Sequence, residues 1–113
     1  SAELRFENGT AAPEPFARIA DHFEGIAPYD EYRVRSTDID VGGHMNNTAY
    51  VRMIMGSLSN EERKALPIRR MDVIFRASCY EGDVLSFRRK ETEDGLDIRV
   101  SRGEETVLLV RIQ

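Results

Sequence analysis

Apolar and polar positions along the chain separate strands from helices. Residues 32–36 alternate between the two kinds, which predicts a strand. Residues 47–58 are apolar on nearly every side of a helical projection, which predicts a helix buried inside the molecule rather than one resting on its surface. Strand-forming residues between turns rich in Gly and acidic residues predict four more strands, at residues 68–80, 84–92, 96–102 and 106–112.

The first thirty residues have a different pattern. Residues 4–7 predict a short strand, and residues 8–15 form a break rich in turn residues. Apolar side chains then recur at helical spacing, which predicts a short amphipathic helix over residues 15–24 built on Phe16, Ile19, Ala20 and Phe23.

Capping residues mark the starts of both helices in the body of the chain. Asn46 or Asn47 is suited to cap the first helix, and Ser59 with Glu62 forms a capping box for a second, which Pro67 ends. This order predicts an α+β fold in which a curved antiparallel β-sheet is wrapped around a central apolar α-helix. A helix on one face of an open sheet is the alternative, and it leaves more of the apolar helix exposed.

Charge and composition narrow the classes of function. The net charge of −4 is uneven, because residues 1–31 carry seven acids and two bases and the rest carry thirteen acids and fourteen bases. The chain therefore divides into an acidic leader, residues 1–30, and a domain, residues 31–113. With no basic excess and no apolar run of about 20 residues, we expect neither a nucleic-acid partner nor a membrane span.

The numbers of cysteine and histidine residues indicate which cofactors and which cellular compartment to expect. Cys79 is the single cysteine, so no disulfide forms within the chain, and a reducing, cytoplasmic setting is expected. One Cys and two well-separated His residues are a poor basis for a metal site. We expect no metal and no cofactor.

The chemistry-bearing residues gather in residues 38–50, which read Asp-Ile-Asp-Val-Gly-Gly-His-Met-Asn-Asn-Thr-Ala-Tyr. An acid, a Gly pair, an imidazole and two amides stand directly before the apolar helix. A helix start presents unpaired N–H groups and a partial positive charge, which can hold an oxyanion. The stretch therefore predicts a site at the helix N-terminus where an acid and a His could attack a thioester.

This stretch resembles the pattern D-x-D-x-x-G-H-x-N-N-x-x-Y of the hot-dog-fold thioesterases, especially those acting on acyl-acyl-carrier-protein (acyl-ACP). It matches at Asp38, Asp40, Gly43, His44, Asn46, Asn47 and Tyr50. A second block, residues 73–85, contains Cys79 before a Gly-Asp turn and is also similar to the family. The resemblance covers roughly residues 30–113. It implies a hot-dog fold and hydrolysis of acyl-ACP, or acyl-coenzyme A (CoA), to a free fatty acid and a thiol.

The resemblance also implies an assembly. Acyl-ACP thioesterases of this family hold two hot-dog repeats in one chain, and 113 residues have room for one. We expect this chain to be the C-terminal repeat, with residues 1–30 as the connector that precedes it. The expected partner surface is a first repeat, or a second copy of the chain in a homodimer.

By the same resemblance, the motif residues take individual roles. Asp40 is the nucleophile or the general base, His44 polarises the carbonyl or serves the attacking water and the leaving thiolate, and the N–H of Asn47 holds the oxyanion. The expected substrate contacts are Gly43, Met45, Asn46, Tyr50 and Cys79. Most of them have a structural alternative: Asp40 as a turn residue, His44 as a loop residue, the Asn side chains as caps, Tyr50 as a packed aromatic and Cys79 as a small buried residue.

Two wider sets of side chains fit either a functional role or a structural one. The helix and the loop before it could line an acyl tunnel or fill the core through Met45, Met53, Ile54, Met55 and Leu58. A basic set could meet a phosphopantetheine phosphate or an acidic carrier protein, or simply face solvent: Arg69, Arg70, Arg88, Arg89 and Lys90.

Two positions depart from the family pattern and motivate the rival functions. Gly42 stands where the family usually has Asn, and Ser78 stands where many bacterial members have Glu. The main alternative is therefore a non-catalytic acyl-binding or dimerisation module. A hydratase of acyl thioesters shares the fold but relies on a different Asp/His pattern, and a transcriptional regulator of this fold is not favoured because no helix-turn-helix segment precedes the domain.

Overall fold

Six strands form one antiparallel sheet, in the order β1-β3-β6-β5-β4-β2. The computed structural model describes residues 2–7, 14–66 and 68–113. The strands are β1 (Ala2–Glu7), β2 (Asp30–Arg33), β3 (Arg70–Phe75), β4 (Val84–Glu91), β5 (Leu96–Arg102) and β6 (Glu105–Ile112). Two helices, α1 (Asn47–Gly56) and α2 (Asn60–Ala65), lie between β2 and β3 in sequence and follow a 3-10 turn at Ser36–Asp38.

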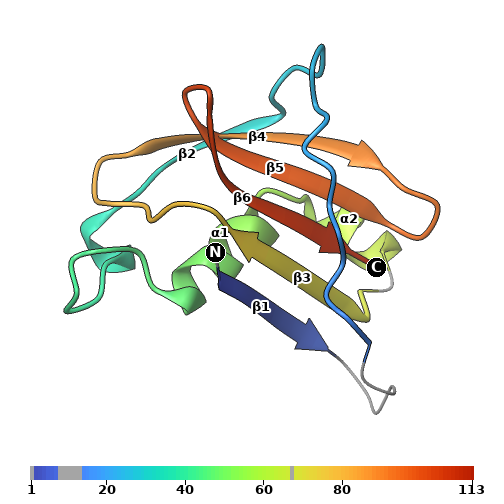
Figure 1. Ribbon diagram of the computed structural model, residues 1–113, viewed down its shortest axis with the longest axis horizontal. Helices are drawn as coiled ribbons and strands as arrows, with labels where there is room; N and C mark the ends of the chain where they lie inside the picture. The colour runs from blue at the N-terminus through green and yellow to red at the C-terminus, as the bar shows by residue number, and fades with distance from the viewer. Residues whose placement is uncertain (1, 8–13, 67) are drawn as a thin grey trace.

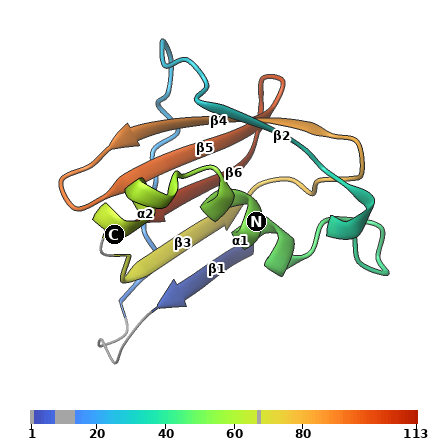
Figure 2. The same cartoon turned by 180° about the vertical axis from the view of Figure 1, so that it is seen from behind.

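The sheet separates the helices from the leader. Figures 1 and 2 show that α1 and α2 lie on one face of the curved sheet while the segment before β2 crosses the other. The strands β4, β5 and β6 follow one another as hairpins, and β3 pairs with the far side of β6. The predicted α+β architecture, with a curved antiparallel sheet around one main helix, is confirmed. None of the helices in the described ranges is long and apolar enough to cross a membrane.

The predicted strands are present with adjusted ends. The strand predicted at residues 32–36 lies earlier, as β2 at Asp30–Arg33. The strand predicted at 96–102 is found at those bounds, and those predicted at 84–92 and 106–112 shift by one residue at one end. The strand predicted at 68–80 is shorter, because the N–H groups of Arg76 and Ala77 both donate to the carbonyl of Val107 and the ladder ends there.

The helix α1 is capped as predicted and packs its apolar side on the sheet. The Asn46 side-chain oxygen accepts a hydrogen bond of 2.9 Å from the N–H of Ala49, which satisfies one of the unpaired donors of the first turn. The buried side of α1 consists of Ala49, Tyr50, Met53 and Ile54. They meet sheet residues that are completely buried, among them Val73, Leu85, Phe87, Ile98 and Val110.

The opposite side of α1 is open, so the prediction of a helix buried on all sides is wrong in this respect. Arg52 is exposed, and Val51 and Met55 are only partly buried. All six strands lie on the same side of α1, so the sheet covers only that side of the helix. Val51 and Met55 nevertheless pack against the edge of the core.

The second helix has the predicted capping box. Ser59 Oγ accepts from the N–H of Glu62 at 3.0 Å, and Glu62 Oε1 accepts from the N–H of Ser59 at 2.9 Å. The helix ends at Ala65. Pro67, which the sequence predicts as its terminator, lies outside the described residues.

The leader contains no helix at residues 15–24, and the predicted amphipathic helix is wrong. That segment is extended, and its apolar residues Ile19 and Phe23 pack against Leu109 on the outer face of the sheet. A helix of ten residues is marginal by itself, so contacts with the sheet decide its conformation.

Side chains from the sheet bind the backbone of this segment and of the residues just after it. The Asp72 carboxylate accepts from the N–H of Ala17 at 2.8 Å, and Arg88 donates to the carbonyl of Ile26 at 2.9 Å. Arg5 of β1 binds Asp72 from the other side at 2.6 Å. The predicted strand at 4–7 is thus confirmed as part of β1, and most of the predicted break at residues 8–15 lies outside the described residues.

Candidate active site

The loop between the 3-10 turn and α1 is a tight hairpin. Ile39 and Met45 form an isolated antiparallel bridge. Inside it, the N–H of Asp40 donates to the carbonyl of His44, and the N–H of Gly43 donates to the carbonyl of Asp40, both at 3.1 Å. Gly43 has a φ of +86°, a conformation that residues with a side chain rarely adopt. Gly43 therefore serves the turn itself, and the turn brings residues 40 and 44 together.

Gly42 lies between the two candidate catalytic side chains. A Cβ atom at this position would stand 3.1 Å from Asp40 Oδ1 and 3.4 Å from His44 Cε1. Asp40 Oδ1 already accepts the N–H of Gly42 at 2.8 Å. The carboxylate and the imidazole thus converge on one point, and both are exposed. His44 also makes an edge-to-face contact with Tyr80, with 6.3 Å between ring centroids.

The start of α1 leaves two backbone donors available. Asn46 is committed to the fold, because its Oδ1 caps Ala49 and its own N–H donates to the carbonyl of Asp38 at 3.1 Å. Within the described part of the chain, the N–H groups of Asn47 and Thr48 have no acceptor. They sit at the positive end of the helix dipole, where a developing negative charge is stabilised.

Asp38, two positions before the catalytic candidate, is buried and is a residue to which sequence reasoning gave no role. Its carboxylate accepts the hydroxyl of Tyr32 at 2.7 Å and the N–H of Arg35 at 2.9 Å. Its carbonyl receives the N–H of Asn46. Asp38 therefore anchors both ends of the motif loop, and its place as the first residue of the matched pattern was the available indication.

Tyr50 and Cys79 tie the two motif blocks together. The N–H of Cys79 donates to the Tyr50 hydroxyl at 3.1 Å, and the carbonyl of Cys79 accepts the N–H of Met45 at 2.9 Å. Burial raises the pKa of the Cys79 thiol. A buried, protonated thiol is a poor nucleophile. The geometry thus agrees with the structural alternative for Cys79.

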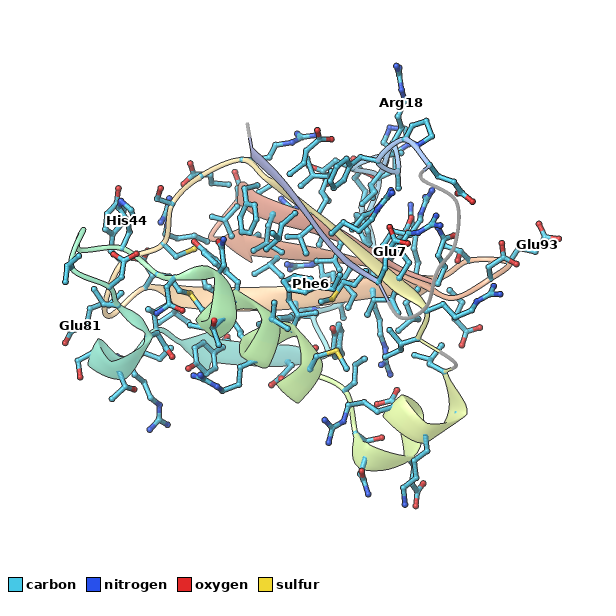
Figure 3. The ribbon with its side chains drawn as sticks, turned by 90° about the horizontal axis from the view of Figure 1, so that it is seen from below. Phe6, Glu7, Arg18, His44, Glu81 and Glu93 are labelled. Atoms are coloured by element: carbon cyan, nitrogen blue, oxygen red, sulfur yellow. The ribbon has the colours of Figure 1, made fainter. Side chains whose placement is uncertain are left out.

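A cavity of about 420 Å³ opens at the N-terminal end of α1. Residues of both motif blocks line it together with residues of β1 and β3: Glu3, Leu4, His44, Met45, Asn47, Tyr50, Phe75, Arg76, Ala77 and Ser78. Of the sequence-predicted residues, the cavity therefore brings together His44, Met45, Asn47 and Tyr50. Asp40, Gly43, Asn46 and Cys79 are not among the residues that line it. Figure 3 shows His44 beyond the end of α1.

The candidate acyl-tunnel residues divide into two groups. Met53, Ile54 and Leu58 are buried in the core beneath the sheet. Met45 lines the cavity at the helix start, and Met55 lines a second cavity at the other end of α1. The apolar side of the helix that faces the sheet is therefore packing.

The basic side chains do not gather into an anion site. Arg70 binds Glu14 at 2.7 Å, and Arg89 binds Glu62 at 2.6 Å. Lys90 donates to a carbonyl of the leader. These cations are held by acids and carbonyls of the chain itself, which agrees with a structural role. In the described ranges, no group of three or more His, Cys, Asp or Glu side chains could hold a metal ion.

The family model described as acyl-ACP thioesterase C-terminal domain matches residues 26–111. The chain belongs to this family. Among solved structures, an acyl-ACP thioesterase from Bacteroides thetaiotaomicron is similar at 26% identity with a TM-score of 0.71, over 91% of this chain and 41% of that one.

Two further thioesterase structures share the fold. A putative oleoyl thioesterase from Lactobacillus plantarum has 18% identity and a TM-score of 0.66, over 94% of this chain and 43% of that one. A 12:0-ACP thioesterase from Umbellularia californica has 18% identity and a TM-score of 0.64, over 88% and 38%. A search of curated proteins gave no match.

These likenesses confirm the hot-dog fold and the correspondence with a C-terminal domain. The chain spans about two fifths of the length of the three solved thioesterases.

Proposed function

We propose that this domain hydrolyses acyl thioesters and releases a carboxylic acid and a thiol. The observation that carries the proposal is the cavity of about 420 Å³, because His44 and the first turn of α1 at Asn47 share its wall. A proton-transferring side chain and free backbone N–H groups beside one cavity are what acyl transfer needs. Membership of the acyl-ACP thioesterase family supports acyl-ACP as the substrate, with acyl-CoA as the second choice.

The first turn of α1 would hold the charge that develops during attack. With the thioester carbonyl oxygen at the N–H groups of Asn47 and Thr48, the tetrahedral oxyanion receives two backbone hydrogen bonds and the helix dipole. Asn46 contributes by fixing the helix start, since its side chain caps Ala49.

Asp40 and His44 would divide the proton transfers. Water attacks the carbonyl carbon while the Asp40 carboxylate takes one of its protons. The carbon–sulfur bond then breaks, and the protonated His44 gives its proton to the leaving thiolate. Asp40 returns its proton to His44, which restores both groups. Their convergence at Gly42 supports this pairing, and the place of His44 on the cavity wall supports its role at the leaving group.

The first test is thiol release from a panel of acyl-ACP and acyl-CoA thioesters. We expect Asp40→Asn and His44→Gln each to lower the rate about 100-fold or more, the usual scale of general acid–base catalysis. Asp94→Asn is the matched control, because Asp94 is exposed in the β4–β5 turn and remote from the cavity. Full activity in Asp40→Asn would remove Asp40 from the mechanism.

The second candidate is a non-catalytic acyl-binding module. The observation that favours it is the position of Asp40, which is exposed and does not line the cavity. Ser78, on the cavity wall, offers a hydroxyl that cannot act as a base near neutral pH. Tight binding of fatty acids by a chain that leaves every thioester in the panel intact would establish this function instead.

The domain would work as a pair, with a second copy or with another hot-dog repeat. The length of the Bacteroides thioesterase supports this pairing, because this chain corresponds to 41% of it. Light scattering after size-exclusion chromatography at micromolar concentration tests the homodimer. A monodisperse monomer would rule it out.

A further inference from the structure

Tyr80 is a large aromatic residue that the hydrophobic core does not use. It is 50% exposed, and it does not line the cavity at the start of α1. Its ring meets the ring of His44 edge to face, with 6.3 Å between the centroids and 75° between the planes. Aromatic rings attract one another in this arrangement, because the positive edge of one points at the negative face of the other. The contact gives Tyr80 a place beside a candidate catalytic side chain.

The imidazole of His44 needs such a neighbour. It is exposed, and within the described ranges neither of its ring nitrogens takes part in a hydrogen bond or an ion pair. The torsion that turns an imidazole has broad energy wells, so an exposed ring rotates unless a neighbour holds it. Proton transfer requires the ring nitrogen to lie within hydrogen-bond reach of the reacting group. A contact that limits the rotation of His44 therefore bears directly on its proposed role.

A tight turn fixes the direction in which Tyr80 leaves the chain. The N–H of Asp83 donates to the carbonyl of Tyr80 at 3.1 Å, and the Asp83 carboxylate accepts the N–H of Tyr80 at 2.9 Å. Gly82, at the third position of this turn, has a φ of +88°, as a type II turn requires there. The backbone of Tyr80 is thus held at both its N–H and its carbonyl.

Arg102, the last residue of β5, ties this turn to the sheet. One terminal nitrogen of its guanidinium donates to Asp83 Oδ2 at 2.7 Å and to the carbonyl of Ser78 at 3.0 Å. The other terminal nitrogen donates to Glu105 Oε1 at 2.7 Å. The segment that carries Tyr80 is therefore anchored on both sides of that residue, although the Tyr80 ring itself is exposed.

The hairpin that carries His44 is joined to the same segment. The N–H of Met45 donates to the carbonyl of Cys79 at 2.9 Å, so the residues next to His44 and Tyr80 are directly bonded. Figure 3 shows His44 and Glu81, the residue after Tyr80, at the same end of the molecule. This hydrogen bond fixes the separation of the two backbones from which the rings extend.

We infer that Tyr80 is a positioning residue for His44, whose imidazole it holds in one orientation by ring-to-ring contact. The inference rests on the proposed function and adds a residue to the same site. In that orientation the Cε1–Nε2 edge of His44 lies near Gly42, because a Cβ there would stand 3.4 Å and 3.5 Å from these two atoms. The same Cβ would stand 3.1 Å from Asp40 Oδ1, so the ring edge is turned toward the proposed base.

NMR of the histidine rings tests the contact without using the reaction. The sequence has two histidines, and His44→Gln identifies the signals of His44. Overhauser cross-peaks should join the ring protons of His44 and Tyr80 in the parent. Tyr80→Ala should move the His44 signals, because the ring current of Tyr80 is lost, and should leave those of His22, which is exposed in the leader. Absent cross-peaks, or His44 signals that stay in place in Tyr80→Ala, would overturn the inference.

Thiol release distinguishes a positioning role from a structural one. Tyr80→Ala should lower kcat about tenfold or more with KM unchanged, because the substrate still binds while the imidazole is misplaced. Tyr80→Phe should keep the parental kcat, since the contact uses the ring and not the hydroxyl. Glu81→Ala is the matched control, because it removes an exposed side chain from the same turn. An equal fall in Glu81→Ala and Tyr80→Ala would contradict a role for the ring.

These experiments separate the inference from the proposed function. If the parent hydrolyses thioesters and Tyr80→Ala retains the parental kcat, hydrolysis stands and the positioning role falls. If the parent leaves every thioester intact, the proposed function falls, and the NMR signals still decide whether Tyr80 holds the His44 ring.

Discussion

Asp38 and Asp40 illustrate how burial assigns roles to chemically identical side chains. Asp38 is 3% exposed and receives hydrogen bonds from Tyr32 and Arg35, so its lone pairs are committed to holding the loop. Asp40 is exposed, and the Gly42 N–H is its one side-chain hydrogen bond in the described part of the chain. Only the second carboxylate is available to a water molecule or a substrate.

Gly42→Ala tests whether Asp40 and His44 work as a pair. The added Cβ would stand 3.1 Å from Asp40 Oδ1 and 3.4 Å from the His44 ring, so one of them must move by a few tenths of an ångström. We expect thiol release to fall about tenfold, because small misplacements of catalytic groups are costly. The free energy of unfolding, measured in urea, should change by only about 0.5 kcal/mol, as at other exposed positions.

Gly43→Ala is the contrasting variant at the next position. Its φ of +86° strains any residue with a side chain, although a Cβ there meets nothing within 4 Å. We therefore expect a loss of about 1–2 kcal/mol in stability. Unchanged thiol release in Gly42→Ala would mean that the spacing of Asp40 and His44 does not matter for the reaction.

For single residues, the sequence predicted which of them lie together at the candidate site only in part. Local spacing was sufficient to bring His44, Met45 and Asn47 to one cavity, since they are close in the chain and precede one helix. It could not place Asp40 outside that cavity or bury Asp38, because both outcomes depend on the direction in which the hairpin folds. That direction is set by distant partners such as Tyr32 and the carbonyl of Cys79.

Prediction of the helices and strands is limited in the same way, because distant partners decide some of them. The spacing of Ile19 and Phe23 fits one face of a helix, but it equally lets an extended segment place both on a sheet. The sheet decides through donors that the leader cannot supply, such as Arg88 for the carbonyl of Ile26. By contrast α1 and α2 carry their caps within a few residues, at Asn46 and Ser59, and both were predictable.

Gly95 at the turn between β4 and β5 fixes how closely this hairpin approaches the end of β6. A Cβ at Gly95 would lie 1.9 Å from the carbonyl oxygen of Ile112, which is backbone and cannot rotate away. We expect Gly95→Ala to lower the free energy of unfolding by about 1–3 kcal/mol, as overpacking does.

Gly56→Ala is the matched control in urea unfolding. Gly56 is the last residue of α1, and a Cβ there meets nothing within 4 Å. Replacing a helical Gly with Ala should stabilise the domain by about 0.5–1 kcal/mol. Equal effects of the two substitutions would contradict the close approach at Ile112.

For the whole molecule, one buried carboxylate joins β1, β3 and the leader. Asp72 of β3 is 1% exposed and binds Arg5 of β1 through Nε at 2.6 Å. It also accepts the N–H of Ala17 at 2.8 Å, which ties the leader to the same point. Because Glu3 and Leu4 of β1 line the cavity at the start of α1, the ion pair also holds part of that cavity's wall.

The pKa of Asp72 gives this junction a defined pH dependence. Burial acts to raise that pKa, but the hydrogen bonds from Arg5 and Ala17 and the positive charge of Arg5 outweigh it, so it lies below its ordinary value. The unfolded chain, in which a carboxyl has a pKa of about 3.9, therefore binds the proton more readily than the folded one. The stabilisation is complete above about pH 5 and is lost as the pH falls below about 4.

Urea unfolding of the parent and Asp72→Asn between pH 7 and pH 3 measures this stabilisation. Removing one partner of a buried pair should lower the free energy of unfolding by about 3 kcal/mol at pH 7. The gap between the two proteins should narrow below about pH 4, because the unfolded parent then binds a proton at Asp72 that the folded parent resists, whereas the variant has no carboxyl at this position. Asp94→Asn, at an exposed turn, should follow the parent at every pH. A gap that stays constant down to pH 3 would show that the Asp72 carboxylate does not hold β1 and the leader through its charge.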